Sequence, residues 1–394
     1  MQDYKSKIAR LCAFDVKSDP LLRGFGKLNS NNAADALEGC AEIVRTLALS
    51  GLTLSDYIHD MLIFSDSPIV TLQAQNPLES REAAIESDLD VLWTIAAIQF
   101  EEVKAELAER HSNAEFLNIP SIENGKLEYT LDYTADYFVD FAQRHGGGMF
   151  AKYRAFTFDG ELRPIEHIDK IRLSDLKNYE VQRQQVIDNT RCFLAGKPAQ
   201  NVLLYGDRGT GKSSTVKAIL NEFEGLRMVE VSKNDVARLS ELFCKLRAIP
   251  LHFIITIDDL SFAENDDRFG SLKAALEGSL SAKPENILIY ATTNRRKIIR
   301  ESALDREISG ADAIDESMSL ADRFGLFITF TKPDKQGFLD IVHKLAEDMS
   351  INIPKDKLDA SAERFALKHG GRSPRVARQF VDWLYGRISL NLEY

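Results

Sequence analysis

A glycine-rich loop at residues 206–213 carries the residue types that bind phosphate groups. It reads Gly-Asp-Arg-Gly-Thr-Gly-Lys-Ser and follows a short apolar run, Val202 to Tyr205. Glycines let successive backbone N–H groups turn toward an anion, and a following helix adds the positive end of its dipole. Lys212 supplies a charge for β- and γ-phosphates, and the Ser213 hydroxyl is suited to bind Mg²⁺. The predicted binding residues are Gly206, Asp207, Arg208, Gly209, Thr210, Gly211, Lys212, Ser213 and Ser214.

Two adjacent aspartates end an apolar, β-branched run, "FIITIDD". A carboxylate at the end of a strand beside such a loop can hold Mg²⁺, so we assign Asp258, with Ser213, to the metal. The second carboxylate, Asp259, can orient or deprotonate an attacking water. The alternative for Asp259 is that it caps the next helix.

A second buried run, "ILIYATTN", delivers Thr292, Thr293 and Asn294 to the same predicted sheet edge. Asn294 can hold the attacking water or contact the γ-phosphate. Taken alone, an asparagine at this place is more often a turn residue.

Two arginines complete the candidate set. Arg323 stands immediately before the last predicted strand. Its planar guanidinium group is suited to bind a phosphate on a neighbouring subunit. The alternative is that it forms a surface ion pair with Asp322. Arg375 follows Ser373 and Pro374, which are typical of a helix N-cap and first helical residue. A cation in the first turn opposes the helix dipole, and a nearby phosphate would reverse that penalty.

The composition is that of a globular protein with more than one domain. The chain has 394 residues, 44% of them hydrophobic and 28% charged, which favours two or three domains. It shows no apolar run long enough for a membrane span and no signal-peptide core. Four isolated cysteines (Cys12, Cys40, Cys192 and Cys244) and scattered histidines lack metal-site spacing. We therefore expect a cytoplasmic protein without a structural metal.

Charge divides the chain near residue 150. Residues 1–150 carry 24 acidic and 12 basic side chains, a balance of −12, and the remainder carries 36 and 37, a balance of +1. The acidic part would repel nucleic acid, so any such contact would come from the second part.

The first part has helical periodicity and no chemical motif. Apolar residues at three- and four-residue steps predict one long helix from Leu89 to Leu107 and a shorter one from Leu37 to Leu47. The alternation of residues 152–162 then predicts a hairpin or an edge strand. A charged helix follows, with Ser174 as its N-cap and Gly196 just past its end.

From Asn201 onward short β-rich runs alternate with helical ones, which predicts a parallel sheet covered on both faces. After Thr331 only helical periodicity remains. The predicted domains are a mainly helical part (1–150), a linker with a hairpin and a helix (151–200), an α/β domain (201–331) and a small helical lid (332–394).

Together the five elements resemble an AAA+ ATPase: the loop as Walker A, Asp258 and Asp259 as Walker B, Asn294 as sensor 1, Arg323 as arginine finger and Arg375 as sensor 2. Residues 171–385 are similar to a family of uncharacterised bacterial ATP-binding AAA+ proteins, catalogued as a domain of unknown function. The motifs that carry this likeness are "NVLLYGDRGTGKSS", "IDDLSF", "LIYATTNRR", "LADRFGL" and "RVARQF".

The resemblance implies ATP and Mg²⁺ as ligands, a nucleotide-dependent homo-oligomer and a protein partner. It also implies a sensor 1 strand between the two Walker strands, and adenine packed against the linker, near Tyr179 and Val181. The second Walker B acid is Asp rather than the commoner Glu, which implies slow hydrolysis. No aromatic-apolar-Gly pore loop occurs in residues 230–252, which argues against an unfoldase.

Three functions follow as hypotheses. The first is an ATPase that hydrolyses Mg-ATP to ADP and phosphate to drive a conformational change on a partner. The second is a slow or non-hydrolysing ATP-gated switch or loader. The third is a DNA-associated ATPase, whose only local feature is the run Arg295-Arg296-Lys297, and a solvated basic run is the better interpretation of it.

Overall fold

The computed structural model describes residues 2–125, 133–263, 267–277, 284–294, 299–300, 323–390 and 392. The chain divides into two compact units: Met1–Tyr153 with Ile249–Leu251, and Arg154–Ala248 with His252–Tyr394. In the described ranges, no helix has both the length and the apolar character that crossing a membrane requires. The basic run Arg295-Arg296-Lys297 lies outside the described residues.

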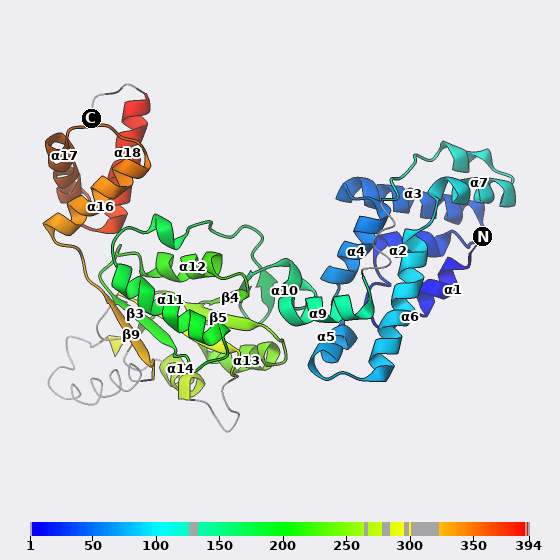
Figure 1. Cartoon of the computed structure of the whole chain (residues 1–394), viewed down its shortest axis with the longest axis horizontal. Coiled ribbons are helices and arrows are strands. Elements are labelled where there is room, and N and C mark those ends of the chain that lie inside the picture. Colours follow the sequence, from blue (N-terminus) through cyan, green and yellow to red (C-terminus); the bar gives the residue numbers. More distant parts are fainter. Residues whose placement is uncertain are drawn as a thin grey trace. The chain divides into compact units, whose positions relative to one another are not determined.

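The first unit is helical, as its periodicity predicted, and is built around one apolar core (Figure 1). Asp88 is fully buried in it, and its carboxylate accepts hydrogen bonds from the backbone N–H groups of Cys12, Ala13 and Phe14. The helices are α1 (Tyr4–Ala9), α2 (Pro20–Lys27), α3 (Ala33–Ser50), α4 (Leu54–Phe64), α5 (Pro68–Gln75), α6 (Glu79–Ala96), α7 (Phe100–Arg110), η1 (Ala114–Asn118), α9 (Ala135–His145) and α10 (Met149–Lys152).

The single long helix predicted from Leu89 to Leu107 is wrong, because it is two helices. α6 ends at Ala96 and α7 begins at Phe100. The Ile98 carbonyl accepts a hydrogen bond from the Asn124 side chain, 26 residues away in sequence. A tertiary contact thus lies at the break, which no glycine or proline marks in the sequence.

The second unit contains a seven-stranded sheet in the order β2-β1-β4-β5-β7-β3-β9. β1 and β2 form the predicted hairpin, and every other neighbouring pair is parallel. The bounds are β1 (Ala155–Phe158), β2 (Leu162–Pro164), β3 (Val202–Gly206), β4 (Leu226–Val231), β5 (His252–Ile257), β7 (Ile287–Thr293) and β9 (Leu326–Phe330), with a separate short pair of β6 (Phe262–Ala263) and β8 (Ile299–Arg300).

Helices cover both faces of this sheet (Figure 1). One face packs against α11 (Glu180–Leu194) and α12 (Lys212–Glu222) in a shared apolar core. Around the other face lie α13 (Leu239–Arg247) and α14 (Asp267–Glu277), and η3 (Val236–Arg238) packs against both. The predicted α/β class, a parallel sheet between helices with a helical first part and a helical lid, is confirmed.

The start of the charged linker helix was predicted wrongly. Ser174 lies in a short 3₁₀ turn, η2 (Leu173–Asp175), and α11 begins only at Glu180. Asn178 and Tyr179 between them have φ of 74° and 62°. Left-handed residues end any helical run, so Ser174 cannot cap α11.

Three helices with their own core form the end of the unit: α16 (Lys335–Asp348), α17 (Lys355–Lys368) and α18 (Pro374–Ser389). The predicted start of α18 is confirmed. Ser373 is the N-cap, and its hydroxyl accepts a hydrogen bond from the Val376 N–H at 3.3 Å. We call these three helices the lid.

The Tyr290 hydroxyl links the centre of the sheet to α11. The ring is fully buried, and the hydroxyl lies 2.8 Å from Thr190 Oγ1 and 3.0 Å from Asn189 Nδ2. Tyr290→Phe would leave the half-buried Asn189 amide N–H without its acceptor and would remove the bond to Thr190, so we expect a loss of about 1 kcal/mol in the free energy of unfolding. Urea unfolding followed by circular dichroism measures it. Tyr385→Phe, at a tyrosine 48% exposed, is the control, and an equal loss there would contradict the assignment.

Candidate nucleotide-binding site

The loop between β3 and α12 has a backbone that only glycine readily adopts. Gly206 and Gly209 have φ of 136° and 77°, in the region where side chains are disfavoured. A Cβ on Gly206 would also collide with the Phe330 carbonyl oxygen on the neighbouring strand. The loop therefore wraps closely against β9, with the Asp207 N–H donating to the Phe330 carbonyl at 2.9 Å.

Lys212, the first residue of α12, is buried beside this loop. Its Nζ donates to the carbonyls of Gly206 (3.0 Å) and Asp207 (2.8 Å) and to Asn294 Oδ1 (3.0 Å). Burial lowers the pKa of Lys212, and the nearby carboxylates of Asp207, Asp258 and Asp259 oppose that shift. The ammonium is thus held among acceptors at the centre of the site.

The two acids at the end of β5 are joined to the loop and to β7. Ser213 Oγ donates to Asp258 Oδ1 at 2.6 Å, and the Thr292 hydroxyl donates to the same oxygen. Asn294 Nδ2 donates to Asp259 Oδ1 at 2.8 Å. Asn294 therefore connects Lys212 to Asp259, while Ser213 and Thr292 form a second hydrogen-bonded group around Asp258. The Asp259 N–H, which donates to Thr292 Oγ1, links the two groups.

The strand order of the sheet explains why Asn294 lies close to both the glycine-rich loop and the two acids. β7 lies between β3 and β5, as the resemblance implied, so Asn294 at its end reaches both the loop and the acids. Strands that run parallel bring their carboxyl ends to one edge, where ligands of open α/β sheets bind.

The lid closes one side of the loop. Arg375 N–H donates to the Gly209 carbonyl at 3.1 Å, and a Cβ on Gly209 would touch the Ser373 hydroxyl and Arg375 Cβ. A cavity of about 1280 Å³, which we call the loop–lid cavity, is lined by Arg208 to Thr215, both acids, Asn294, Arg375 and parts of the linker and lid. The N-terminus of α18, the acids and the loop thus face one space.

The remaining predicted residues differ in their position relative to the loop–lid cavity. Tyr179 lines the loop–lid cavity and donates to the Thr331 carbonyl at 2.6 Å, and burial raises its pKa to about 12. Val181 is 70% exposed and is absent from that lining, so it is not brought to the site. Arg323 is partly buried and also lies outside the lining.

Other lining residues were not predicted from the sequence. On the lid, Ile341, Leu345 and Met349 line the loop–lid cavity, as does the linker segment 174–179. Their periodicity is that of an ordinary core face, so only the cavity distinguishes them. The salt bridge from Lys177 to Asp348 (2.7 Å) joins linker to lid at the same place.

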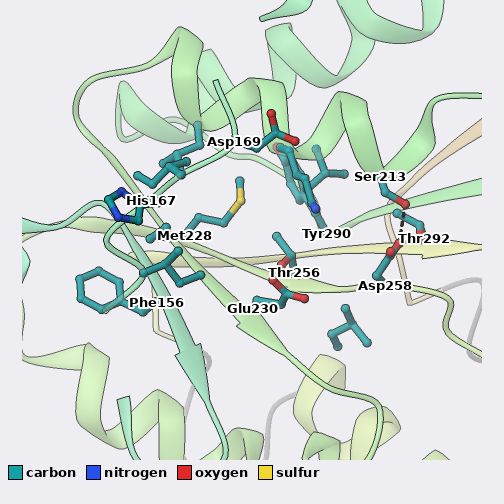
Figure 2. A pocket seen from close by; sticks show the side chains of 17 residues that line it. Phe156, His167, Asp169, Ser213, Met228, Glu230, Thr256, Asp258, Tyr290 and Thr292 are labelled. Atoms are coloured by element: carbon teal, nitrogen blue, oxygen red, sulfur yellow. Dashed lines mark hydrogen bonds between the residues drawn. The ribbon is translucent and has the colours of Figure 1, made fainter. Parts of the chain in front are cut away.

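A second cavity of about 260 Å³ lies between α12 and the sheet. Figure 2 shows His167, Met228, Glu230 and Thr256 in its lining, with Ser213, Asp258 and Thr292 at one end. The predicted magnesium ligands therefore form part of the walls of both cavities.

Ser213 and Asp258 suit a magnesium ion. Both offer oxygen atoms, and Mg²⁺ is typically held by one or two protein oxygens together with phosphate oxygens and waters. The Ser213 proton is directed to Asp258, so the hydroxyl lone pairs remain free for a cation. The donor set fits the ion.

Comparison with known proteins found partial matches to longer proteins. The ATP-dependent zinc metalloprotease FtsH of Aquifex aeolicus is 28% identical over 250 residues, covering 54% of this chain and 36% of FtsH. The Cell division cycle protein 48 homolog of Archaeoglobus fulgidus is 29% identical over 181 residues, covering 40% of this chain and 22% of that protein. The match thus spans well under half of either relative.

Among solved structures, the Thermotoga maritima RuvB Holliday junction branch migration motor aligns with a TM-score of 0.40 and 16% identity, over 56% of this chain and 66% of that one. A family model described as "Protein of unknown function (DUF815)" matches residues 149–388. That range is more than half of the chain and contains the glycine-rich loop, Asp258, Asp259, Asn294 and Arg375. The protein is therefore an AAA+ P-loop member of the DUF815 family.

Proposed function

We propose that the protein binds Mg-ATP in the loop–lid cavity, hydrolyses it to ADP and phosphate, and uses the cycle to change the conformation of a protein partner. The observation that carries this proposal is a pair of adjoining hydrogen-bonded groups: Asn294 bridges Lys212 and Asp259, and Ser213 donates to Asp258. It unites a phosphate-binding cation, a metal-binding pair and a water-binding acid within one site.

Each side chain has a role in this proposal. The loop N–H groups and Lys212 hold the β- and γ-phosphates, which the positive end of α12 also attracts. Ser213 and Asp258 hold Mg²⁺, which neutralises charge on the phosphate oxygens. Asp259 accepts the proton of the attacking water, and Asn294 orients that water. The base lies toward Tyr179, Ile341 and Leu345, at the linker and lid end of the loop–lid cavity.

The lid provides a route from nucleotide to partner. Arg375 is connected to the loop through its backbone at Gly209, and its side chain is proposed to meet the γ-phosphate. Loss of that phosphate would release an arginine that stands unfavourably at a helix N-terminus. Movement of the lid relative to the sheet would follow, and the linker contact between Lys177 and Asp348 would transmit it.

The same site supports a slower, switch-like alternative. Asp259 is one methylene shorter than glutamate, and its Oδ1 is engaged by Asn294, so the acid reaches less far toward a water. Such a protein would act through the bound state, as an ATP-gated switch or loader. We further propose nucleotide-dependent homo-oligomers, and a cytoplasmic setting in keeping with four cysteines outside disulfides.

Phosphate release separates hydrolysis from switching. We expect the wild-type protein to release phosphate from Mg-ATP, and Asp259→Asn to bind ATP with unchanged affinity but to turn over about 10²- to 10⁴-fold more slowly, because an amide cannot accept the water's proton. A coupled phosphate assay and calorimetry make the two measurements.

Asp382→Asn, which removes an exposed acid on the lid, is the matched control and should keep the wild-type rate. Tight ATP binding with no phosphate release by the wild-type protein would favour the switch. An Asp259→Asn variant that hydrolyses at the normal rate would remove Asp259 from the mechanism.

A further inference from the structure

Thr292 lies at the junction of the two acids. It belongs to β7, two residues before Asn294, and is 5% exposed. Its hydroxyl contacts Asp258 Oδ1, and the Asp259 N–H donates to it at 3.1 Å. The backbone N–H of Asp259 can only donate, so the Thr292 hydroxyl oxygen accepts from it. The single hydroxyl proton of Thr292 is therefore donated to the Asp258 carboxylate. Figure 2 shows the side chains of Thr292 and Ser213 next to that of Asp258.

The backbone at Asp259 explains why such a contact is needed. Its φ is +50°, a left-handed conformation that a non-glycine residue keeps only where its surroundings hold it. Thr292 holds it on both sides, because its hydroxyl accepts from Asp259 N–H and its carbonyl accepts from Leu260 N–H at 2.7 Å. The corner after β5 is thereby fixed to β7.

We propose that Thr292 is a positioning residue that sets the direction of both acids, a role that rests on the proposed Mg-ATP function. In the described part of the chain, hydrogen bonds reach only the Oδ1 atom of Asp258, from Thr292 and Ser213. That arrangement leaves Oδ2 to the cation and its water shell. The Asp259 N–H bond in turn directs the second carboxylate toward Asn294, where the attacking water is proposed to bind.

The test compares Thr292→Val, which keeps the shape and loses the hydroxyl, with Thr292→Ser, which keeps the hydroxyl. Affinity for a fluorescent ATP analogue is measured in EDTA and then during a Mg²⁺ titration. For Thr292→Val we expect unchanged affinity in EDTA and a Mg²⁺ half-saturation point raised about tenfold, the usual scale for one hydrogen bond to a charged group. Thr292→Ser should stay close to wild type.

Thr293→Val is the matched control. Thr293 is buried on the same strand, and its side chain points to the opposite face of the sheet because strand residues alternate. It should leave the Mg²⁺ requirement unchanged. An unchanged requirement in Thr292→Val, a serine variant as defective as the valine variant, or an equal loss of ATP affinity in EDTA would each overturn the positioning role.

Amide exchange gives a readout that needs no nucleotide. With selective ¹⁵N-aspartate labelling, the Asp259 amide should exchange about tenfold faster in Thr292→Val than in wild type, because its acceptor is gone. Thr292→Ser should retain the protection. A wild-type protein that binds no Mg-ATP would overturn the proposed function, and the Asp259 amide would then decide the Thr292 contact by itself. Equal exchange in all variants would overturn that contact.

Discussion

Lys212→Ala should lose ATP binding while keeping its fold. The ammonium is the cation that the loop holds at its centre, bonded to the Gly206 and Asp207 carbonyls and to Asn294. Hydrogen bonds to charged groups contribute about 1.5–3 kcal/mol each, so losing the bonds to two phosphates predicts an affinity at least about 100-fold weaker. Calorimetry with ATP and Mg²⁺ measures it.

The fold should survive this change because burial opposes the charge. Burial is the main cause that lowers the pKa of Lys212, so removing the ammonium also removes a desolvation cost. Lys217→Ala is the matched control, since Lys217 is an exposed lysine on the same helix and is not part of the loop–lid cavity lining. Unchanged ATP affinity in Lys212→Ala, with a wild-type circular dichroism spectrum, would refute the site.

Arg323→Ala should bind ATP normally and lose hydrolysis, by about 10³-fold if Arg323 serves as an arginine finger. Arg323 is absent from the loop–lid cavity lining, whereas Arg375 is part of it. The two arginines are therefore expected to differ: Arg375→Ala should weaken ATP binding within its own subunit, and Arg323→Ala should affect a neighbour's nucleotide. Calorimetry and phosphate release on each variant test the difference.

Mixed assemblies provide the decisive measurement. Subunits with Arg323→Ala keep an intact loop, and subunits with Lys212→Ala keep an intact Arg323, so mixing the two inactive variants should restore part of the hydrolysis. Arg191→Ala, on the exposed face of α11, is the control and should be active alone. No recovery at concentrations where oligomers are shown to form would make Arg323 a surface residue. A protein that stays monomeric with ATP would exclude the trans mechanism.

The sequence by itself determined the parts of this site that depend on local chemistry. The glycines of the loop, the strands that end at Asp258 and Asn294, and the Ser373-Pro374 helix start were all predicted from residue types over a few positions, and each element lies where expected. These elements can be predicted from sequence because φ preferences, helix caps and apolar periodicity act over a few neighbouring residues.

Only the tertiary structure decided which of these groups meet. Lys212 and Asn294 are 82 residues apart, and Thr292 and Asp258 are 34 apart. Their contacts depend on β7 lying between β3 and β5, an order that the residues of one strand do not encode. Strand pairing is set by packing of the whole sheet, so local residue patterns do not predict the strand order. The family resemblance implied that order.

The errors have the same origin. The helix predicted from Leu89 to Leu107 is two helices, and the Ile98 carbonyl between them accepts from the distant Asn124. The linker helix begins after left-handed residues at 178–179 instead of at Ser174. Val181, which the family resemblance placed near the adenine, is 70% exposed on α11. In each case periodicity named a helix correctly, but contacts outside the local window set where it starts, where it breaks and which face it buries.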